Sequence, residues 1–314
     1  MPRSFIICSL LVSILAVPLA AQSSRTFAPY MDTSKMADRL FYVQAHTDVT
    51  MMTLAFVVSG KDCTPEWLGR GPVASDTVIA DGVKQLRAHD ADVIIAFGGY
   101  DGLELAQVCK DVSSLKAAYA EVVAKYKPKA LDLDIEHTAI EDPVSIDRRS
   151  QALAALAAEI PELRINYTLP ATPAGLTDLS VTVIKSAVKF GTPVAVVNLM
   201  TMDYGAPVMT GAMGPDAVSA AGAATAQLKS LGLPARIGIT PMIGVNDSEG
   251  ETFTLEDAQV VLNYAMANSN TVALLAFWSI GRDNGSCFGK VSPYCSGIPQ
   301  KDWEFTRILQ KFVQ

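Results

Sequence analysis

One short stretch of the chain alternates acidic and aliphatic residues, reading Leu-Asp-Leu-Asp-Ile-Glu from Leu131 to Glu136. Residues two apart in a β-strand point to the same side, so Asp132, Asp134 and Glu136 would share one face of a strand. The neighbouring candidate strands are largely apolar, which argues against a strand with one face in water. The sequence therefore predicts three carboxyl groups on one buried face.

Three such groups cannot all ionise freely, because burial and neighbouring like charges both penalise the negative form of a carboxyl group. We expect at least one of them to keep its proton near neutral pH. A carboxylic acid in that state can protonate a leaving oxygen as a general acid. Glu136 is the best candidate because it comes last, nearest the strand end where the active sites of parallel barrels lie.

Apolar, β-branched runs alternate with amphipathic segments along the whole chain, which is typical of a parallel sheet covered by helices. The starts of the predicted strands lie 25 to 43 residues apart, as repeated strand–helix units require. The predicted strands are Phe27–Met31, Met52–Val58, Val93–Phe97, Leu131–Glu136, Arg164–Leu169, Val194–Met202, Ile237–Met242 and Val272–Trp278.

Amphipathic segments between these strands predict helices, with Thr254 as an N-terminal cap and Gly191 as a C-terminal cap. The predicted helices are Asp76–His89, Ser113–Tyr126, Ser145–Glu159, Leu179–Phe190, Pro215–Leu231 and Leu255–Ala267. We therefore expect an α/β protein: a (β/α)8 TIM barrel formed by a single catalytic domain without a large insertion domain.

The charge balance restricts the class of partner. The chain has 314 residues, of which 50% are hydrophobic, and its formal net charge is −7. Nucleic acid is an unsuitable ligand, because phosphate binding requires clustered Lys and Arg. A neutral ligand rich in hydroxyl groups is compatible with this balance, although the charge alone does not select it.

The N-terminus resembles a secretory signal peptide. Arg3 precedes an apolar run from Phe5 to Val17, and the small residues Ala20 and Ala21 follow. The run of about 13 residues is too short for a stable membrane anchor, which needs roughly 20. We expect residues 1–21 to be removed, residues 22–314 to form the catalytic domain, and the protein to be secreted and extracellular.

After removal of the signal peptide the chain keeps four cysteines, an even number that suits an oxidising compartment. They allow three pairings. Because loop closure favours near partners, we predict disulfides between Cys287 and Cys295 and between Cys63 and Cys109. Neither a Cys-x-x-Cys motif nor histidines at ligand spacing occur, so we expect no metal site and no cofactor.

The acidic run resembles the D-x-x-D-x-D-x-E motif on the fourth barrel strand of glycoside hydrolase family 18, the chitinases and their relatives. Asp132, Asp134 and Glu136 match its last three acids, whereas Lys129 replaces the leading aspartate. Further segments match family motifs in the same order along the chain. They are Ala96-Phe97-Gly98-Gly99, with Ala96 in place of a serine; Met200-Thr201-Met202-Asp203-Tyr204, with Met202 in place of a tyrosine; and Trp278 at the end of the eighth strand.

The resemblance implies a retaining reaction in which the N-acetyl group of the substrate acts as the nucleophile. Glu136 would protonate the glycosidic oxygen, Asp134 would hold the acetamide nitrogen, and Asp132 would share its proton with Asp134. Trp278 would stack beneath the reacting sugar. The other residues that the resemblance implies in substrate binding are Asp203, Tyr204, Gly98, Gly99 and Met200, with Tyr204 assigned only by its chemistry and position.

The implied substrate is chitin or N-acetylglucosamine oligosaccharides, and we expect a monomer. Two alternatives stay open: a catalytically inactive barrel that binds chitin oligosaccharides as a lectin or effector, and an endo-β-N-acetylglucosaminidase. Retention of Glu136 favours an enzyme over the first, and the loops that would decide the second are not readable from sequence. Only a short segment separates Met242 from Leu255, so we expect an open cleft and endo-type cutting.

Overall fold

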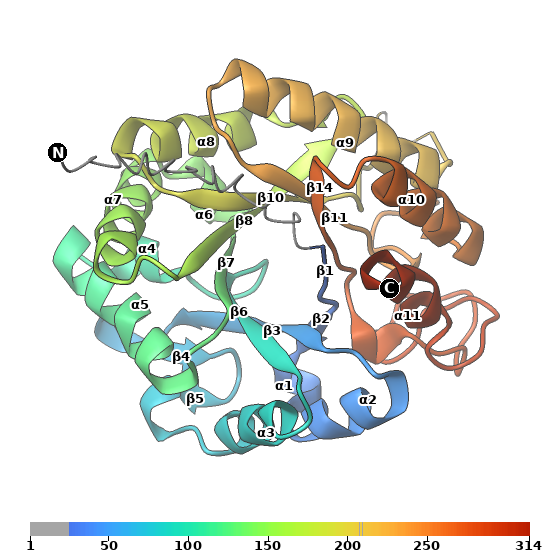
Figure 1. Ribbon diagram of the computed structural model, residues 1–314, viewed down its shortest axis with the longest axis horizontal. Helices are drawn as coiled ribbons and strands as arrows, with labels where there is room; N and C mark the ends of the chain where they lie inside the picture. Colours follow the sequence, from blue (N-terminus) through green and yellow to red (C-terminus); the bar gives the residue numbers. More distant parts are fainter. Residues whose placement is uncertain (1–24, 207, 209) are drawn as a thin grey trace, which may run out of the picture.

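The computed structural model describes residues 25–206, 208 and 210–314. The predicted signal peptide, residues 1–21, lies outside these residues. The described chain forms a closed ring of parallel strands with helices around it (Figure 1). The predicted α/β fold, a single-domain (β/α)8 barrel, is confirmed.

The barrel strands follow the predicted order. Within the described chain, β1 (Thr26–Phe27) and β2 (Tyr30–Asp32) share the first position, and the others are β3 (Met51–Ser59), β6 (Asp92–Gly98), β7 (Ala130–Asp134), β8 (Arg164–Thr172), β10 (Val194–Met200), β11 (Arg236–Thr240) and β14 (Val272–Leu275). Four predictions ran past the observed C-terminal ends, to Glu136, Met202, Met242 and Trp278. Two of these residues, Met242 and Trp278, still form an isolated parallel bridge beyond the observed strand ends, so the apolar run follows the pairing further than the continuous ladder does.

The barrel closes between its first and last strands. β1 pairs in parallel with β14, and β2 pairs in parallel with β3. Pro29, between β1 and β2, has no N–H to donate, although its carbonyl oxygen accepts from the Thr53 N–H at 3.0 Å. The missing donor explains why one predicted strand appears as two short ones.

All six predicted helices are present and surround the ring of strands (Figure 1). They are α3 (Val78–Arg87), α5 (Val112–Tyr126), α7 (Pro143–Glu159), α8 (Asp178–Phe190), α9 (Met213–Ser230) and α10 (Leu255–Ala267). The predicted caps are confirmed. The Thr254 side chain accepts from the Asp257 N–H, and Gly191 ends α8 in the left-handed region at φ 69°.

Several shorter elements were not predicted, because each is too short to show a period. The helices are α1 (Thr33–Met36), α2 (Leu40–Thr47), α4 (Leu105–Val108), α6 (His137–Glu141) and α11 (Glu304–Leu309). The strands are β4 (Pro65–Trp67), β5 (Gly71–Pro72), β9 (Gly175–Leu176), β12 (Gly244–Val245) and β13 (Thr252–Phe253). The 3-10 helices are η1 (Ala37–Arg39), η2 (Lys61–Cys63), η3 (Val73–Ser75), η4 (Ile280–Arg282) and η5 (Gln310–Val313).

The apolar interior has two parts. The larger lies between the strands and the helices, where the aliphatic residues of β7, Leu131 and Leu133, are fully buried. Inside the barrel, apolar side chains fill the N-terminal layer: Ala28, Ile94, Ala130, Val196, Ala273 and Leu274. Burying one such large aliphatic side chain contributes about 1.5–3 kcal/mol. The barrel is therefore sealed below and becomes polar only towards its C-terminal end.

Both predicted disulfides are confirmed, Cys63–Cys109 and Cys287–Cys295. The segment after β11 carries only the hairpin of β12 and β13, which agrees with the predicted lack of an insertion domain. No helix among residues 25–206, 208 and 210–314 is long and apolar enough to cross a bilayer.

Candidate active site

Strand β7 delivers the three predicted acids to the C-terminal end of the barrel. Asp132 and Asp134 lie within the strand and are 1% and 5% exposed. Glu136 lies two residues beyond β7 and is the residue before α6, so the prediction that it belongs to the strand is wrong. Its backbone is still extended, at φ −141° and ψ −175°, which keeps it in step with the two aspartates.

Asp132 is held by two hydroxyl groups. The Tyr30 hydroxyl donates to Oδ2 at 2.6 Å, and the Thr168 hydroxyl donates to Oδ1 at 2.7 Å. Burial raises the pKa of Asp132 to about 6, while these two hydrogen bonds lower it. Both oxygens thus have a partner that favours the charged form inside an apolar barrel.

Asp134 lacks such support. Its Oδ1 is buried and has no hydrogen-bond partner among the described residues. Burial, followed by the charges of Glu136, Asp132 and Glu104, raises the pKa of Asp134 well above its ordinary value. A proton shared between the two aspartates is therefore held preferentially by Asp134.

Glu136 is mostly buried at the mouth of the barrel. Burial, and then the charges of Asp203 and Asp101, raise the pKa of Glu136 to about 7. A carboxyl group with this pKa is protonated for a large part of the time near neutral pH. It can give its proton to a leaving oxygen and take one back from water.

The predicted glycines Gly98 and Gly99 hold the end of β6 against β7. Gly98 has φ +90°, and a Cβ there would lie 2.2 Å from the backbone oxygen of Asp134. Gly99 has φ +80°, a Cβ there would lie 2.7 Å from the Phe56 ring, and its N–H donates to the Asp134 oxygen at 3.0 Å. Only glycine allows this close approach, so the pair fixes the backbone that carries Asp134.

Asp203 lies beyond β10 in the left-handed conformation, at φ 50°. Its Oδ1 accepts from the Ser248 N–H at 2.8 Å, and the buried Glu251 accepts from the next two backbone N–H groups, those of Tyr204 and Gly205. Burial raises the pKa of Asp203. Loop residues after β11 thus position Asp203, whose charge acts on Glu136.

Tyr204 is placed differently from the other predicted binding residues. Its ring packs against the core between strands and helices, and Asp216 and Glu251 are the charged groups that act on its hydroxyl. That hydroxyl is buried and has no hydrogen-bond partner among the described residues. Its contact with an acetamido group stays a prediction.

Trp278 belongs to an aromatic group at the mouth of the barrel. Its ring stacks on Phe56 with centroids 5.6 Å apart, and the Tyr30 ring lies 6.2 Å away. Trp278 and Phe56 are half-buried. Met200, the last residue of β10, is also half-buried. The group forms an apolar floor beside the acids.

The three departures from the family motifs lie in different places. Lys129 precedes β7 at the N-terminal end of the barrel, and its Nζ lies 3.4 Å from Asp92. Ala96 is paired with Asp132 across β6 and β7, where a serine would stand beside the carboxyl group. The hydroxyl on Asp132 comes instead from Thr168 of β8. Met202 lies in the half-buried turn beyond β10.

Sequence reasoning missed the polar side chains linked to Asp132. Tyr30 and Thr168 bond to it directly, and Asn198 and Thr240 follow along the same series of hydrogen bonds. Thr168 and Asn198 interrupt runs of apolar residues on β8 and β10 at inward-facing positions. A search for polar residues at the two-residue period of buried strands would have found them. Their mutual contacts depend on the register between strands, which no single strand shows.

A second buried carboxylate lies outside the barrel wall. Glu104, before α4, forms a bidentate ion pair with Arg149 of α7; Nε donates to Oε1 at 2.6 Å and Nη2 donates to Oε2. Both residues are almost fully buried. The pair lies near Tyr119 of α5 and Tyr167 of β8, which surround it with apolar rings.

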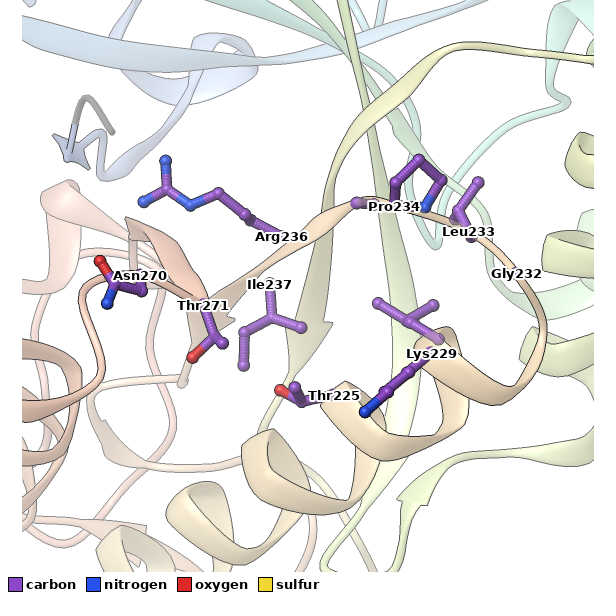
Figure 2. A pocket seen from close by; sticks show the side chains of 11 residues that line it. Thr225, Lys229, Gly232, Leu233, Pro234, Arg236, Ile237, Asn270 and Thr271 are labelled. Carbon is purple, nitrogen blue, oxygen red and sulfur yellow. The ribbon is translucent and has the colours of Figure 1, made fainter. Parts of the chain in front are cut away.

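A cavity of about 420 Å³ lies far from these acids, at the N-terminal end of β11 (Figure 2). Its wall includes Leu233, Pro234, Ile237, Thr271 and the cation Lys229, and no carboxylate lines it. This cavity therefore lacks the acidic side chains that gather at the other end of the barrel. Among the described residues, no group of three His, Cys, Asp or Glu side chains is arranged to hold a metal ion.

Two curated relatives match the chain. The probable bifunctional chitinase/lysozyme of Escherichia coli K12 is 35% identical over 326 residues, covering 96% of this chain and 36% of that protein. Endochitinase 11 of Metarhizium anisopliae is 34% identical over 288 residues, covering 86% of this chain and 54% of that protein. The chain thus spans about a third to a half of the length of these relatives. No family model matches the chain.

Solved structures agree with these matches. The catalytic domain of a hyperthermophilic chitinase from Pyrococcus furiosus has a TM-score of 0.82 and 34% identity, covering 92% of this chain and 95% of that one. Variants of the same chitinase domain have been solved with chito-oligosaccharides. A family 18 chitinase from Pseudoalteromonas aurantia, at a TM-score of 0.60 and 15% identity, shares the fold alone.

Proposed function

The chain belongs to the chitinases of glycoside hydrolase family 18, and from this premise we propose that it is a secreted chitinase that hydrolyses β-1,4-linked N-acetylglucosamine polymers with retention of configuration. The observation that carries the proposal is the buried row Asp132, Asp134 and Glu136 at the mouth of the barrel. No cation pairs with these three carboxyl groups among the described residues, so protons must neutralise part of their charge.

In the first step Glu136 gives its proton to the glycosidic oxygen, and the bond between that oxygen and the anomeric carbon breaks. The carbonyl oxygen of the substrate's own N-acetyl group attacks the same carbon and forms a cyclic oxazolinium ion. Asp134 accepts a hydrogen bond from the acetamide N–H and places negative charge beside the cation. For this its proton passes to Asp132, which the Tyr30 and Thr168 hydroxyls hold in reach.

In the second step water attacks the anomeric carbon from the side that the leaving group occupied. Glu136, now a carboxylate, takes a proton from that water, and the oxazolinium ring opens to restore the N-acetyl group. Two inversions at one carbon give net retention. Trp278 and Phe56 offer the apolar floor on which the reacting sugar can stack.

The pKa values define the active pH range. Glu136 must carry its proton, which it loses as pH rises through about 7. The aspartate pair must keep one negative charge, which it loses as pH falls through about 6, the pKa of Asp132. Activity is expected to be highest between these two values and to fall on both sides.

The short loop after β11 supports endo-type cutting. Only residues 243 to 254 lie between Met242 and α10, and they form the small hairpin of β12 and β13. So few residues cannot build a wall beside the acids. A polymer can then enter at an internal bond, without being threaded from one end.

The test is Glu136→Gln, assayed on a soluble chitin derivative by viscosity and by reducing ends. The parent should lower viscosity steeply while few reducing ends appear, and Glu136→Gln should abolish both signals, because the amide has no proton to give at this position. Glu141→Gln, an exposed change on α6, is the matched control and should match the parent. Oligosaccharide binding without turnover in the parent would identify the alternative, an inactive binding barrel.

A further inference from the structure

The hydrogen bonds on Asp132 continue sideways around the barrel wall. The Thr240 hydroxyl of β11 donates to Asn198 Oδ1 at 2.8 Å, and Asn198 Nδ2 of β10 donates to the Thr168 hydroxyl of β8 at 3.0 Å. Thr168 donates in turn to Asp132 of β7 at 2.7 Å. Four neighbouring strands thus contribute one residue each to a continuous row.

This row has a direction because of the chemistry of its members. An amide nitrogen can only donate, an ionised carboxylate can only accept, and a hydroxyl group has a single hydrogen. Thr168 accepts from Asn198, so its one hydrogen points to Asp132. Thr240 occupies the amide oxygen of Asn198, which turns the amide nitrogen towards Thr168.

Tyr30 completes the group and is the member that can change its partner. Its hydroxyl lies 2.6 Å from Asp132 Oδ2 and 2.9 Å from the Thr168 hydroxyl, where either oxygen can be the donor. When Asp132 is charged, Tyr30 donates to it. When Asp132 holds a proton on Oδ2, it can donate to Tyr30, which then donates to Thr168. Thr168 keeps its hydrogen on Asp132 in both states.

We propose that Asn198 and Thr240 are positioning residues for the reaction: through Thr168 they aim a fixed hydrogen-bond donor at Asp132 and so keep one negative charge on the Asp132–Asp134 pair. The proposal rests on the proposed function, since it concerns the same acids. It also accounts for Ala96, because Thr168 supplies the hydroxyl that is missing from β6.

The row is built into the barrel. Asn198 is fully buried, and Thr168 and Thr240 are 1% and 2% exposed. Gly238, the residue of β11 paired with Asn198, leaves the necessary room, since a Cβ there would lie 2.5 Å from Asn198 Oδ1. These side chains therefore cannot exchange their partners for water without a change in the barrel wall.

Other groups that face the pair set its remaining charge interactions. Tyr30 of β2 is the titratable group in contact with Asp132, and Glu136 and Glu104 act on Asp134 from beyond β7 and from outside the wall. The inward residues of β6 beside Asp132 and Asp134 are Ala96 and Gly98, which carry no charge. On β8, the residue paired with Asp132 is the uncharged Asn166. The donors on Asp132 are the hydroxyl groups of Tyr30 and Thr168.

The test compares variants by the pH dependence of kcat/KM on a soluble chitin oligomer. Thr168→Val keeps the shape and removes the donor, so the acid limb should move to higher pH by about 1 unit, and activity at pH 6 should fall about 5-fold. Asn198→Leu and Thr240→Val should move the same limb in the same direction by less, about 3-fold at pH 6. The alkaline limb, which belongs to Glu136, should not move.

Two controls separate positioning from stability. Thr168→Ser keeps the hydroxyl group and should restore the parent's acid limb. Thr53→Val removes a buried barrel hydroxyl that donates to the Ala28 carbonyl oxygen, and it should leave both limbs in place. An unchanged acid limb in folded Thr168→Val, or in Thr240→Val if Thr168→Val does not fold, would overturn the proposal.

A second readout does not need turnover. The carbonyl stretch of protonated carboxyl groups, followed by infrared difference spectroscopy against pH, should titrate at higher pH in Thr168→Val than in the parent. If the parent cuts no chitin, the proposed function fails, and this titration still decides whether the row acts on Asp132. Identical titrations in the two proteins would refute the role of the row.

Discussion

Two buried carboxylate groups lie on opposite sides of the barrel wall and differ in their counter-charge. Outside the wall, Glu104 is paired with the Arg149 guanidinium through two hydrogen bonds. Inside the wall, Asp132 and Asp134 face hydroxyl groups and each other. The outer group satisfies a buried charge with an opposite charge, whereas the inner group must hold a proton.

The difference shows how the fold separates stability from chemistry. A carboxylate in a bidentate pair with arginine is fixed in its charge and geometry, which suits a structural role. Carboxyl groups without a cation have raised pKa values, and their protons can move when a substrate arrives. A buried carboxyl group therefore has a structural role in the outer pair, whereas in the inner group it can exchange a proton.

Loss of the arginine from the outer ion pair should have a large effect on stability. Arg149→Met should lower the free energy of unfolding by about 3–5 kcal/mol, because it leaves the Glu104 charge buried and unpaired. The double variant Arg149→Met with Glu104→Gln should recover much of that loss. Urea denaturation of the parent, the single variant and the double variant measures these free energies of unfolding. A double variant no more stable than Arg149→Met would show that the arginine acts through packing and not through charge.

Loss of the Asp134 carboxyl group from the inner group should affect activity more than stability. Asp134→Asn should lower kcat by roughly 10²- to 10³-fold, since in the proposed mechanism it removes the negative charge that faces the oxazolinium ion. Its stability should equal or exceed that of the parent, because the amide removes the repulsion between negative charges within the buried acidic row. Kinetics and denaturation on the same preparation are the measurement. A loss of stability as large as that of Arg149→Met would show that the inner carboxyl groups stabilise the fold as much as the outer ion pair does.

A smaller difference between the two groups concerns the pH dependence of stability. The pKa of Asp132 is about 6 in the folded protein against an ordinary 3.8, so the folded state binds a proton that the unfolded state has lost. The stability that this proton contributes, about 3 kcal/mol, is fully present below pH 3.8 and is lost as pH rises through 6. Glu136 acts in the same direction, up to about pH 7.

Denaturation at a series of pH values should therefore show a stability that falls from pH 4 to pH 7. Asp132→Asn should flatten the part of the curve near pH 6, because its amide does not titrate. Thr53→Val, which removes a buried hydroxyl group that donates to the Ala28 carbonyl oxygen, is the control, and it should keep the slope of the parent. A parent curve that rises over this range would contradict the raised pKa values.

Features that depend on local order could be predicted from the sequence. The two-residue period of Leu131–Glu136 placed three acids on one face, and the alternation of strands and helices predicted the barrel. Loop closure predicted both disulfides, including Cys63–Cys109 across 46 residues. Each of these rests on spacing along the chain, which is visible without coordinates.

Contacts between side chains that are distant in sequence could not be predicted, because they depend on strand register and helix packing. Tyr30 contacts Asp132 across 102 residues of sequence, and Asn198 reaches Thr168 because β10 pairs with β8 in a particular register. The outer pair of Glu104 and Arg149 depends on how α7 packs on the wall. A shift of one residue in any of these registers would turn an inward side chain outward, and the acids would then keep their order in the sequence but lose the contacts that set their protons.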